Sequence, residues 1–180
     1  MIILVRADDR LIHGMVAVSW TSAIKPETIL VANDEAAGDS FKAATMKLAK
    51  PAGVKLIIKT KDDSIKALNN PINDRKKIFL VTETVEDACY IWERVKGIAK
   101  LNIGTAGVNK KPGEEYIPTL PQVFMTQKEF TCAKKMADAG VEVFAQIGTV
   151  PGPHELQRNR KNICQIENYK EGKNLCFRDS

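Results

Sequence analysis

The chain has 180 residues, of which 44% are hydrophobic and 27% charged, with a formal net charge of +5. The length fits one domain, the composition argues against disorder, and the apolar runs are too short to span a bilayer. The lysines are spread among acids and alanines without interleaved aromatic side chains, so we expect solvated helix faces and no nucleic-acid partner. Because the amino terminus carries no pattern of a cleavable signal, we expect a cytoplasmic protein.

Strand-like and helix-like segments alternate along the chain, which is typical of parallel strands joined by crossover helices. Apolar and β-branched runs predict strands over 2–6, 28–32, 54–59, 77–82, 99–104, 122–125 and 141–147. Helical periodicity predicts helices over 14–24, 39–48, 62–69, 85–96 and 127–139. Thr84 and Thr126, each followed three residues later by an acid, fit helix starts. We therefore expect an α/β fold: a single-domain, open, mostly parallel sheet of about seven strands with helices on both faces.

The composition changes after Val150. Pro151-Gly152-Pro153 breaks the alternation, and the residues that follow are mostly polar. We therefore expect residues 1–150 to form the domain and residues 151–180 to form a polar C-terminal extension. The sequence leaves open whether this extension packs loosely or binds a partner.

His13 and Gly14 lie at the first predicted strand-to-helix turn. In an open α/β sheet this turn lies beyond the carboxyl end of a strand, where such folds bind ligands. A helix that begins near Gly14 would direct unpaired N–H groups at an anion, and Arg10 adds a planar cation suited to phosphate oxygens. A lone histidine is more often a core or capping residue. Arg10, Gly14 and the adjacent acids favour a catalytic role for His13. A nucleophilic histidine beside an anion site indicates phosphoryl transfer.

Other polar residues are candidates for supporting roles. Adjacent side chains tend to point apart, so only one of the two acids before Arg10 is expected to reach the site; we favour Asp9, orienting Arg10 or the imidazole. Asn33 and Asp34 end the second predicted strand and could complete the rim of the pocket, although helix capping explains them nearly as well. Arg6, at the end of the first strand, could equally pair with an acid and do nothing more.

A glycine-rich, basic loop covers residues 104–113. It matches neither G-x-x-x-x-G-K-[ST] nor G-x-G-x-x-G, so we expect no nucleotide cofactor. The loop either flanks the histidine pocket or is a surface loop. No cysteine or histidine cluster has the spacing of metal ligands, so we expect no metal.

The segment Asp8-Asp9-Arg10-Leu11-Ile12-His13-Gly14 closely resembles the IIB subunit of the mannose/fructose/sorbose family of the bacterial sugar phosphotransferase system (PTS). The likeness covers about residues 1–150. It includes the segments 31–36, 51–54, 101–104 and 111–113. The resemblance implies that His13 carries the phosphoryl group and that Arg10 assists. The chain departs from the family in two places: at Met15, where glutamine is common, and in the final thirty residues, which do not look like the usual ending.

The resemblance also implies the activity and the partners. A IIB component is a protein-histidine sugar phosphotransferase without a cofactor. It accepts a phosphoryl group from a phosphohistidine on IIA and passes it to a hexose held by the IIC and IID membrane subunits. These partners would hold it at the inner face of the membrane, and a homo-oligomer is compatible with the family. One alternative stays open: a regulatory or scaffolding binding module in which His13 is not phosphorylated.

Overall fold

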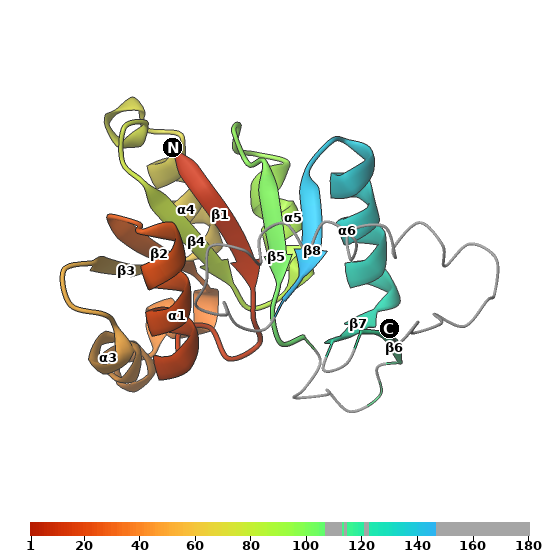
Figure 1. Ribbon diagram of the computed structural model, residues 1–180, viewed down its shortest axis with the longest axis horizontal. Helices are drawn as coiled ribbons and strands as arrows, with labels where there is room; N and C mark the ends of the chain where they lie inside the picture. Colours follow the sequence, from red (N-terminus) through yellow and green to blue (C-terminus); the bar gives the residue numbers. More distant parts are fainter. Residues whose placement is uncertain (107–112, 114, 121–122, 147–180) are drawn as a thin grey trace.

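The computed structural model describes residues 1–106, 113, 115–120 and 123–146, without the side chains of residues 15, 16 and 118–120. Six parallel strands form one sheet in the order β3-β2-β4-β1-β5-β8 (Figure 1). Their bounds are β1 Ile2–Ala7, β2 Thr28–Ala32, β3 Lys55–Lys59, β4 Ile78–Thr82, β5 Lys100–Ile103 and β8 Glu142–Ala145. The predicted α/β class and parallel sheet are confirmed.

Helices cover both faces of the sheet, as predicted (Figure 1). One apolar cluster joins the sheet to α1 Gly14–Ile24, α2 Asp34–Gly38 and α3 Ser40–Ala49. The other cluster joins it to α4 Lys61–Leu68, α5 Val85–Trp92 and α6 Gln127–Asp138. The central strands are buried on both faces, which explains why β2 and β4 are continuous apolar runs.

The strand count differs from the prediction. The run predicted over 122–125 is β7 (Val123–Thr126), which pairs antiparallel with β6 (Tyr116–Leu120) in a separate two-stranded ribbon. A single bridge from Ala106 to Val123 connects this ribbon to the end of β5. The prediction missed β6 because Pro118, which has no N–H to donate, obscures its strand pattern. It also missed α2, whose five residues are too few to show helical periodicity.

The predicted helix starts are confirmed. The Thr84 side chain accepts a hydrogen bond from the Asp87 amide at the start of α5. Thr126 and Glu129 form a reciprocal capping box at the start of α6. α5 ends at Trp92, which is earlier than predicted, and turns follow it.

The helical connections change from one face of the sheet to the other at β1. The connection after β1 runs to α1 on one face, whereas the connections after the neighbouring strands β4 and β5 run to α5 and α6 on the other. The loop after β1 therefore lies at the topological switch point, where open α/β sheets bind ligands. Backbone hydrogen bonds of 2.9 Å, from the Asp8 amide to the Thr82 carbonyl and from the Asp9 amide to the Thr105 carbonyl, attach the loop to both neighbouring strands.

The predicted extension, residues 151–180, lies outside the described residues, so the domain boundary at residue 150 stays a prediction. Within the described part of the chain, no helix is both long enough and apolar enough to cross a bilayer.

Candidate functional site

His13 is the N-cap residue of α1, directly before Gly14. Its backbone is extended, with φ −139° and ψ 160°, and its carbonyl accepts the first helical hydrogen bond, from the Ala17 amide at 2.9 Å. Its side chain makes no capping hydrogen bond, so the ring is not used to satisfy the helix. The side chain is 24% exposed, while its Nε2 atom is buried and has no hydrogen-bond partner among the described residues. The ring therefore meets solvent through its other atoms.

The amino terminus of α1 is open to an anion. Its first turn contains no acidic residue, and a Cβ placed on Gly14 would meet no atom within 4 Å. The first amide groups of a helix have no intrahelical acceptor and lie at the positive end of its dipole. An anion such as a phosphoryl group could therefore bind at this helix terminus, next to His13.

Asp8 connects the charged groups of the site. Its side chain is fully buried, and its Oδ1 atom lies 3.9 Å from Nε2 of His13 and 3.8 Å from Nε of Arg10. The same oxygen accepts a hydrogen bond from the Arg10 amide at 3.1 Å. Arg10 itself is 41% exposed, so its guanidinium can reach a ligand from solvent.

Asp9 was expected to be the orienting acid; Asp8 also lies close to the ring and to Arg10, so the assignment of this role to Asp9 stays a prediction. Asp8 continues the alternation of β1, and this turns its carboxylate inward, below the loop. Asp9 faces Thr105, whose Oγ1 atom lies 2.8 Å from Asp9 Oδ1 and 2.7 Å from Asp8 Oδ1. The hydroxyl has one proton, so it donates to one of these carboxylates at a time.

Arg6 pairs with an acid, which was one of the possibilities left open above, and its place beneath the site was not foreseen. Its guanidinium is fully buried and donates to Oδ2 of Asp8 through Nε at 3.2 Å and Nη2 at 2.7 Å. Nη1 donates to the Asn102 side chain and to the Gln146 carbonyl, and the group lies 5.2 Å from the Trp20 ring. Burial lowers the pKa of Arg6, while the Asp8 carboxylate opposes this shift. The only signal for the pair was its i, i+2 spacing on one strand.

Gly104 makes room for this buried pair. A Cβ at this position would overlap the Arg6 guanidinium and approach Asp8 Oδ2 to 2.7 Å. Gly104 follows β5, at the start of the glycine-rich loop for which a place beside the pocket was one of the possibilities. Thr105 also contacts the site, whereas residues 107–112 lie outside the described part of the chain.

The environment of His13 favours a neutral ring. Burial lowers its pKa below the ordinary value of 6.5, the positive charge of Arg10 lowers it further, and the Asp8 carboxylate partly opposes them. A neutral imidazole keeps a lone pair on one nitrogen, which makes it a nucleophile near neutral pH.

Leu11 and Ile12 anchor the loop between Arg10 and His13. Both side chains are buried in the cluster beneath α1. Leu11 has a φ of 54°, in the left-handed region that side chains rarely occupy, and its amide donates to the Asp8 carbonyl at 2.8 Å. Such strained conformations occur at functional sites where the surroundings hold them in place.

Asn33 and Asp34 lie at the carboxyl edge of the sheet, where they were expected. With Asp9 they line an acid-rich cleft of about 640 Å³ at the carboxyl edge of the sheet. Asn33 caps α2 and donates to Glu83 at 2.6 Å, and Asp34 accepts from the Lys61 amide at 2.9 Å. The helix cap and the ion pair with Lys61 account for the contacts of these two side chains. Their part in ligand binding stays a prediction.

The described residues contain no group of three His, Cys, Asp or Glu side chains placed to hold a metal ion. The Met15 side chain, at one departure from the family pattern, lies outside the description.

The model of the PTS sorbose subfamily IIB component family matches residues 2–173. The chain belongs to this family. It is 36% identical over 149 residues, 82% of the chain and 91% of the relative, to a probable phosphotransferase enzyme IIB component of Streptococcus pyogenes serotype M6. It is 29% identical over 140 residues to the mannose-specific EIIAB component of Escherichia coli K12, covering 78% of the chain and 42% of that protein.

Solved structures support the same family fold. The IIB domain of the sorbose permease from Klebsiella pneumoniae superposes with a TM-score of 0.78, covering 98% of this IIB component and 99% of that domain at 22% identity. The N-acetylgalactosamine-specific IIB component 1 of Escherichia coli superposes with a TM-score of 0.71, covering 86% of this chain and 97% of that one at 27% identity.

Proposed function

We propose that this IIB component carries the phosphoryl group on Nδ1 of His13. The observation that carries the proposal is the asymmetry of the ring: Nε2 is buried and faces Asp8, so Nδ1 is the nitrogen left to accept. The amino terminus of α1, next to the ring, would receive the phosphoryl oxygens.

The transfer balances without a metal or a cofactor. The lone pair on Nδ1 of His13 attacks the phosphorus of a phosphohistidine on IIA, and the P–N bond of the donor breaks. The electron pair of that bond returns to the donor imidazole. Such a transfer needs in-line placement and compensation of the charge on the peripheral oxygens.

Three groups have separate parts in this step. Arg10 neutralises the peripheral oxygens, since its half-exposed guanidinium lies beside the ring and can follow the phosphoryl group. Asp8 favours the N–H form of Nε2 and offsets the positive charge that grows on the ring as Nδ1 bonds to phosphorus. Arg6 is a positioning residue, because it holds the Asp8 carboxylate through its other oxygen.

The second half-reaction passes the group from His13 to a hexose held by the IIC and IID membrane subunits. Relatives named for sorbose, mannose and N-acetylgalactosamine support a hexose as the class of sugar. The mannose-specific EIIAB relative combines A and B in one name, which supports IIA as the donor. We place the protein in the cytoplasm, with its partners holding it at the membrane. Its oligomeric state stays a prediction that sedimentation would test.

The test is transfer from phosphoenolpyruvate through the general phosphotransfer proteins and a cognate IIA, followed by intact-mass measurement. We expect the wild type to gain one acid-labile phosphoryl group and His13→Ala to gain none. His154→Ala changes the other histidine of the chain and serves as the matched control, with full labelling expected. Labelling of His13→Ala would overturn the proposal, as would an unlabelled wild type in the presence of phosphorylated IIA.

A further inference from the structure

The outer face of α3 is apolar although it meets solvent. Phe41 is 80% exposed and Leu48 is 89% exposed, and the two lie seven residues apart on one side of the helix. Ala44 and Thr45 lie between them at the i+3 and i+4 positions and are also exposed. The Thr45 hydroxyl donates to the Phe41 carbonyl at 3.0 Å, so it is satisfied within the helix. We call these four residues the α3 outer face.

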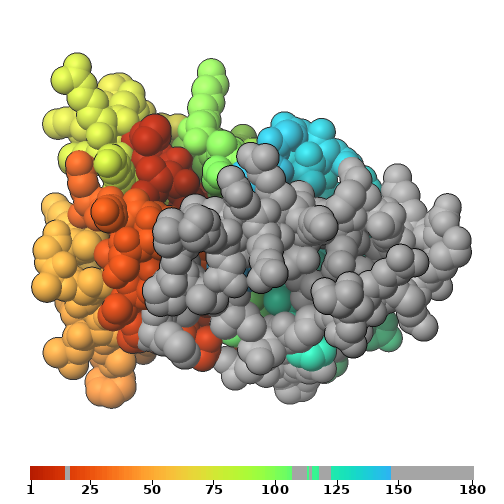
Figure 2. Space-filling model, in the orientation of Figure 1, coloured from red at the N-terminus to blue at the C-terminus, as the bar shows by residue number. Residues whose placement is uncertain are grey.

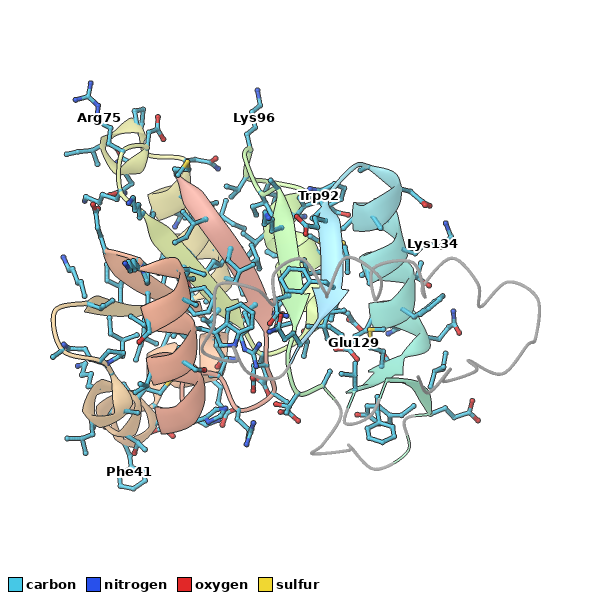
Figure 3. All side chains as sticks on the ribbon, in the orientation of Figure 1. Phe41, Arg75, Trp92, Lys96, Glu129 and Lys134 are labelled. Atoms are coloured by element: carbon cyan, nitrogen blue, oxygen red, sulfur yellow. The ribbon has the colours of Figure 1, made fainter. Side chains whose placement is uncertain are left out.

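In a usual surface helix the apolar stripe faces the core, whereas α3 carries apolar side chains on its outer face as well. Among the residues of α3, only Met46 is fully buried. Phe41 projects away from the rest of the molecule (Figure 3), and the segment around α3 forms the left margin in the space-filling view (Figure 2). The side chain of Phe41 is thus accessible to another surface.

The segment that carries this face is basic, and acids border it at Asp34, Glu35 and Asp39 on one side and at Asp62 and Asp63 on the other. The segment 40–61, which covers α3 and the edge strand β3, contains six lysines and no acid. Two of them are neutralised within the domain, Lys42 by Glu35 and Lys61 by Asp34 and Asp87. The other four form no ion pair within the described part of the chain; they are Lys47, Lys50, Lys55 and Lys59. We call the segment 40–61 the basic edge.

We propose that the α3 outer face and the basic edge dock on an anionic phospholipid surface. Exposed Phe and Leu side chains insert among lipid chains, and lysines nearby are attracted to acidic headgroups even without direct contact. Charge complementarity favours this occupant, because the positive charge follows a whole edge of the domain rather than a shaped pocket.

The small area of the α3 outer face favours a lipid surface over a second copy of the chain. A helix of ten residues presents a face about 15 Å long and about 10 Å wide, roughly 150 Å², whereas a stable protein interface buries about 800 Å² on each partner. A lipid surface needs no such complementarity. The inference goes beyond the proposed function, since none of its residues touches His13.

The test is flotation of the full chain with phosphatidylcholine vesicles, with and without phosphatidylglycerol. We expect binding only with phosphatidylglycerol, weakened by salt. The double variant Phe41→Ser/Leu48→Ser should bind at least about tenfold more weakly, since both apolar anchors are lost. Ile72→Ser is its matched control, because Ile72 is 73% exposed but lies in the short helix Pro71–Asn73, outside the basic edge. This control should bind as the wild type does.

The charge is tested separately. Lys47→Glu/Lys50→Glu should weaken binding at least about tenfold, since the change replaces two lysines attracted to acidic headgroups with two acids that these headgroups repel. Lys96→Glu, at an exposed site outside the basic edge (Figure 3), should weaken it less. His13→Ala should bind as the wild type does, so a failed phosphoryl relay would leave this result unchanged. Three results would overturn the proposal: no vesicle binding, binding unaffected by the Phe41/Leu48 change, or a dimer that this change dissociates.

Discussion

Oδ1 of Asp8 lies 3.9 Å from Nε2 of His13, while Oδ2 of the same carboxylate accepts two hydrogen bonds from the Arg6 guanidinium. The distance to the ring is longer than a hydrogen bond, and a small rotation of the imidazole would close it. Arg6 is thereby coupled to the reactive ring through one buried carboxylate.

Replacing Asp8 tests this coupling. Asp8→Asn keeps the size of the side chain but leaves Arg6 buried with an unpaired charge, so the free energy of unfolding should fall by about 3 kcal/mol. The same change should lower the pKa of His13 further, because it removes a charge that raises it. Chemical denaturation and an NMR titration of His13 measure the two effects. Asp9→Asn is the matched control, with a loss of less than about 1 kcal/mol; equal losses in the two variants would contradict the assignment.

Arg10 should matter for the transfer and little for stability. Arg10→Ala removes the cation that neutralises the phosphoryl oxygens, so the rate of phosphoryl acceptance should fall on the order of 10²-fold. It should also raise the pKa of His13, since the positive charge of Arg10 lowers it. Arg10→Lys restores the charge without the planar fork and should recover part of the rate. Quenched-flow transfer from phospho-IIA gives the rates.

The control for Arg10 is Arg75→Ala, which removes an exposed arginine far from the loop after β1 (Figure 3). It should transfer at the wild-type rate. Equal rates for Arg10→Ala and Arg75→Ala would contradict the role of Arg10 in the transfer.

Gly104 should tolerate no side chain. In Gly104→Ala the new methyl group would push on the buried Arg6–Asp8 pair, and we expect the free energy of unfolding to fall by about 3 kcal/mol. Gly38→Ala adds the same methyl group where nothing lies within 4 Å, and its effect should stay within about 0.5 kcal/mol. Thermal and urea unfolding compare the two. A stable Gly104→Ala protein would mean that the pair can move apart.

The pH dependence follows from the lowered pKa of His13. Below pH 6.5 the unfolded chain takes up a proton on this ring before the folded protein does. The stability of the wild type relative to His13→Gln should therefore fall as the pH drops through 6.5 and level off below the folded pKa. Phosphoryl acceptance should persist below pH 6.5 until that lower pKa is reached. A folded pKa at or above 6.5, measured by NMR, would contradict the account.

Much of this fold was readable from local patterns. The buried strands β2 and β4 are continuous apolar runs, and Thr84 and Thr126 mark helix starts through their own side chains. His13 and Arg10 were found because both lie in one short loop after a strand. The full set of Arg6 partners was not predicted, because Asn102 and Gln146 are far from Arg6 in the sequence.

Other gaps in the prediction also have local causes. The choice between Asp8 and Asp9 depends on which of two adjacent residues continues the alternation of β1, and the sequence does not show where a strand ends. The strand β6 was missed because Pro118 interrupts its pattern. The outer face of α3 has ordinary helical periodicity in the sequence, so only the structure reveals that it points outward.

The most direct test of the account is the identity of the phosphorylated atom. ¹⁵N-labelled protein, phosphorylated through IIA, is examined by NMR for coupling between phosphorus and the ring nitrogens of His13. The account expects coupling to Nδ1 alone, with Nε2 still carrying its proton beside Asp8. Coupling to Nε2, or a phosphoryl group on any residue other than His13, would contradict it.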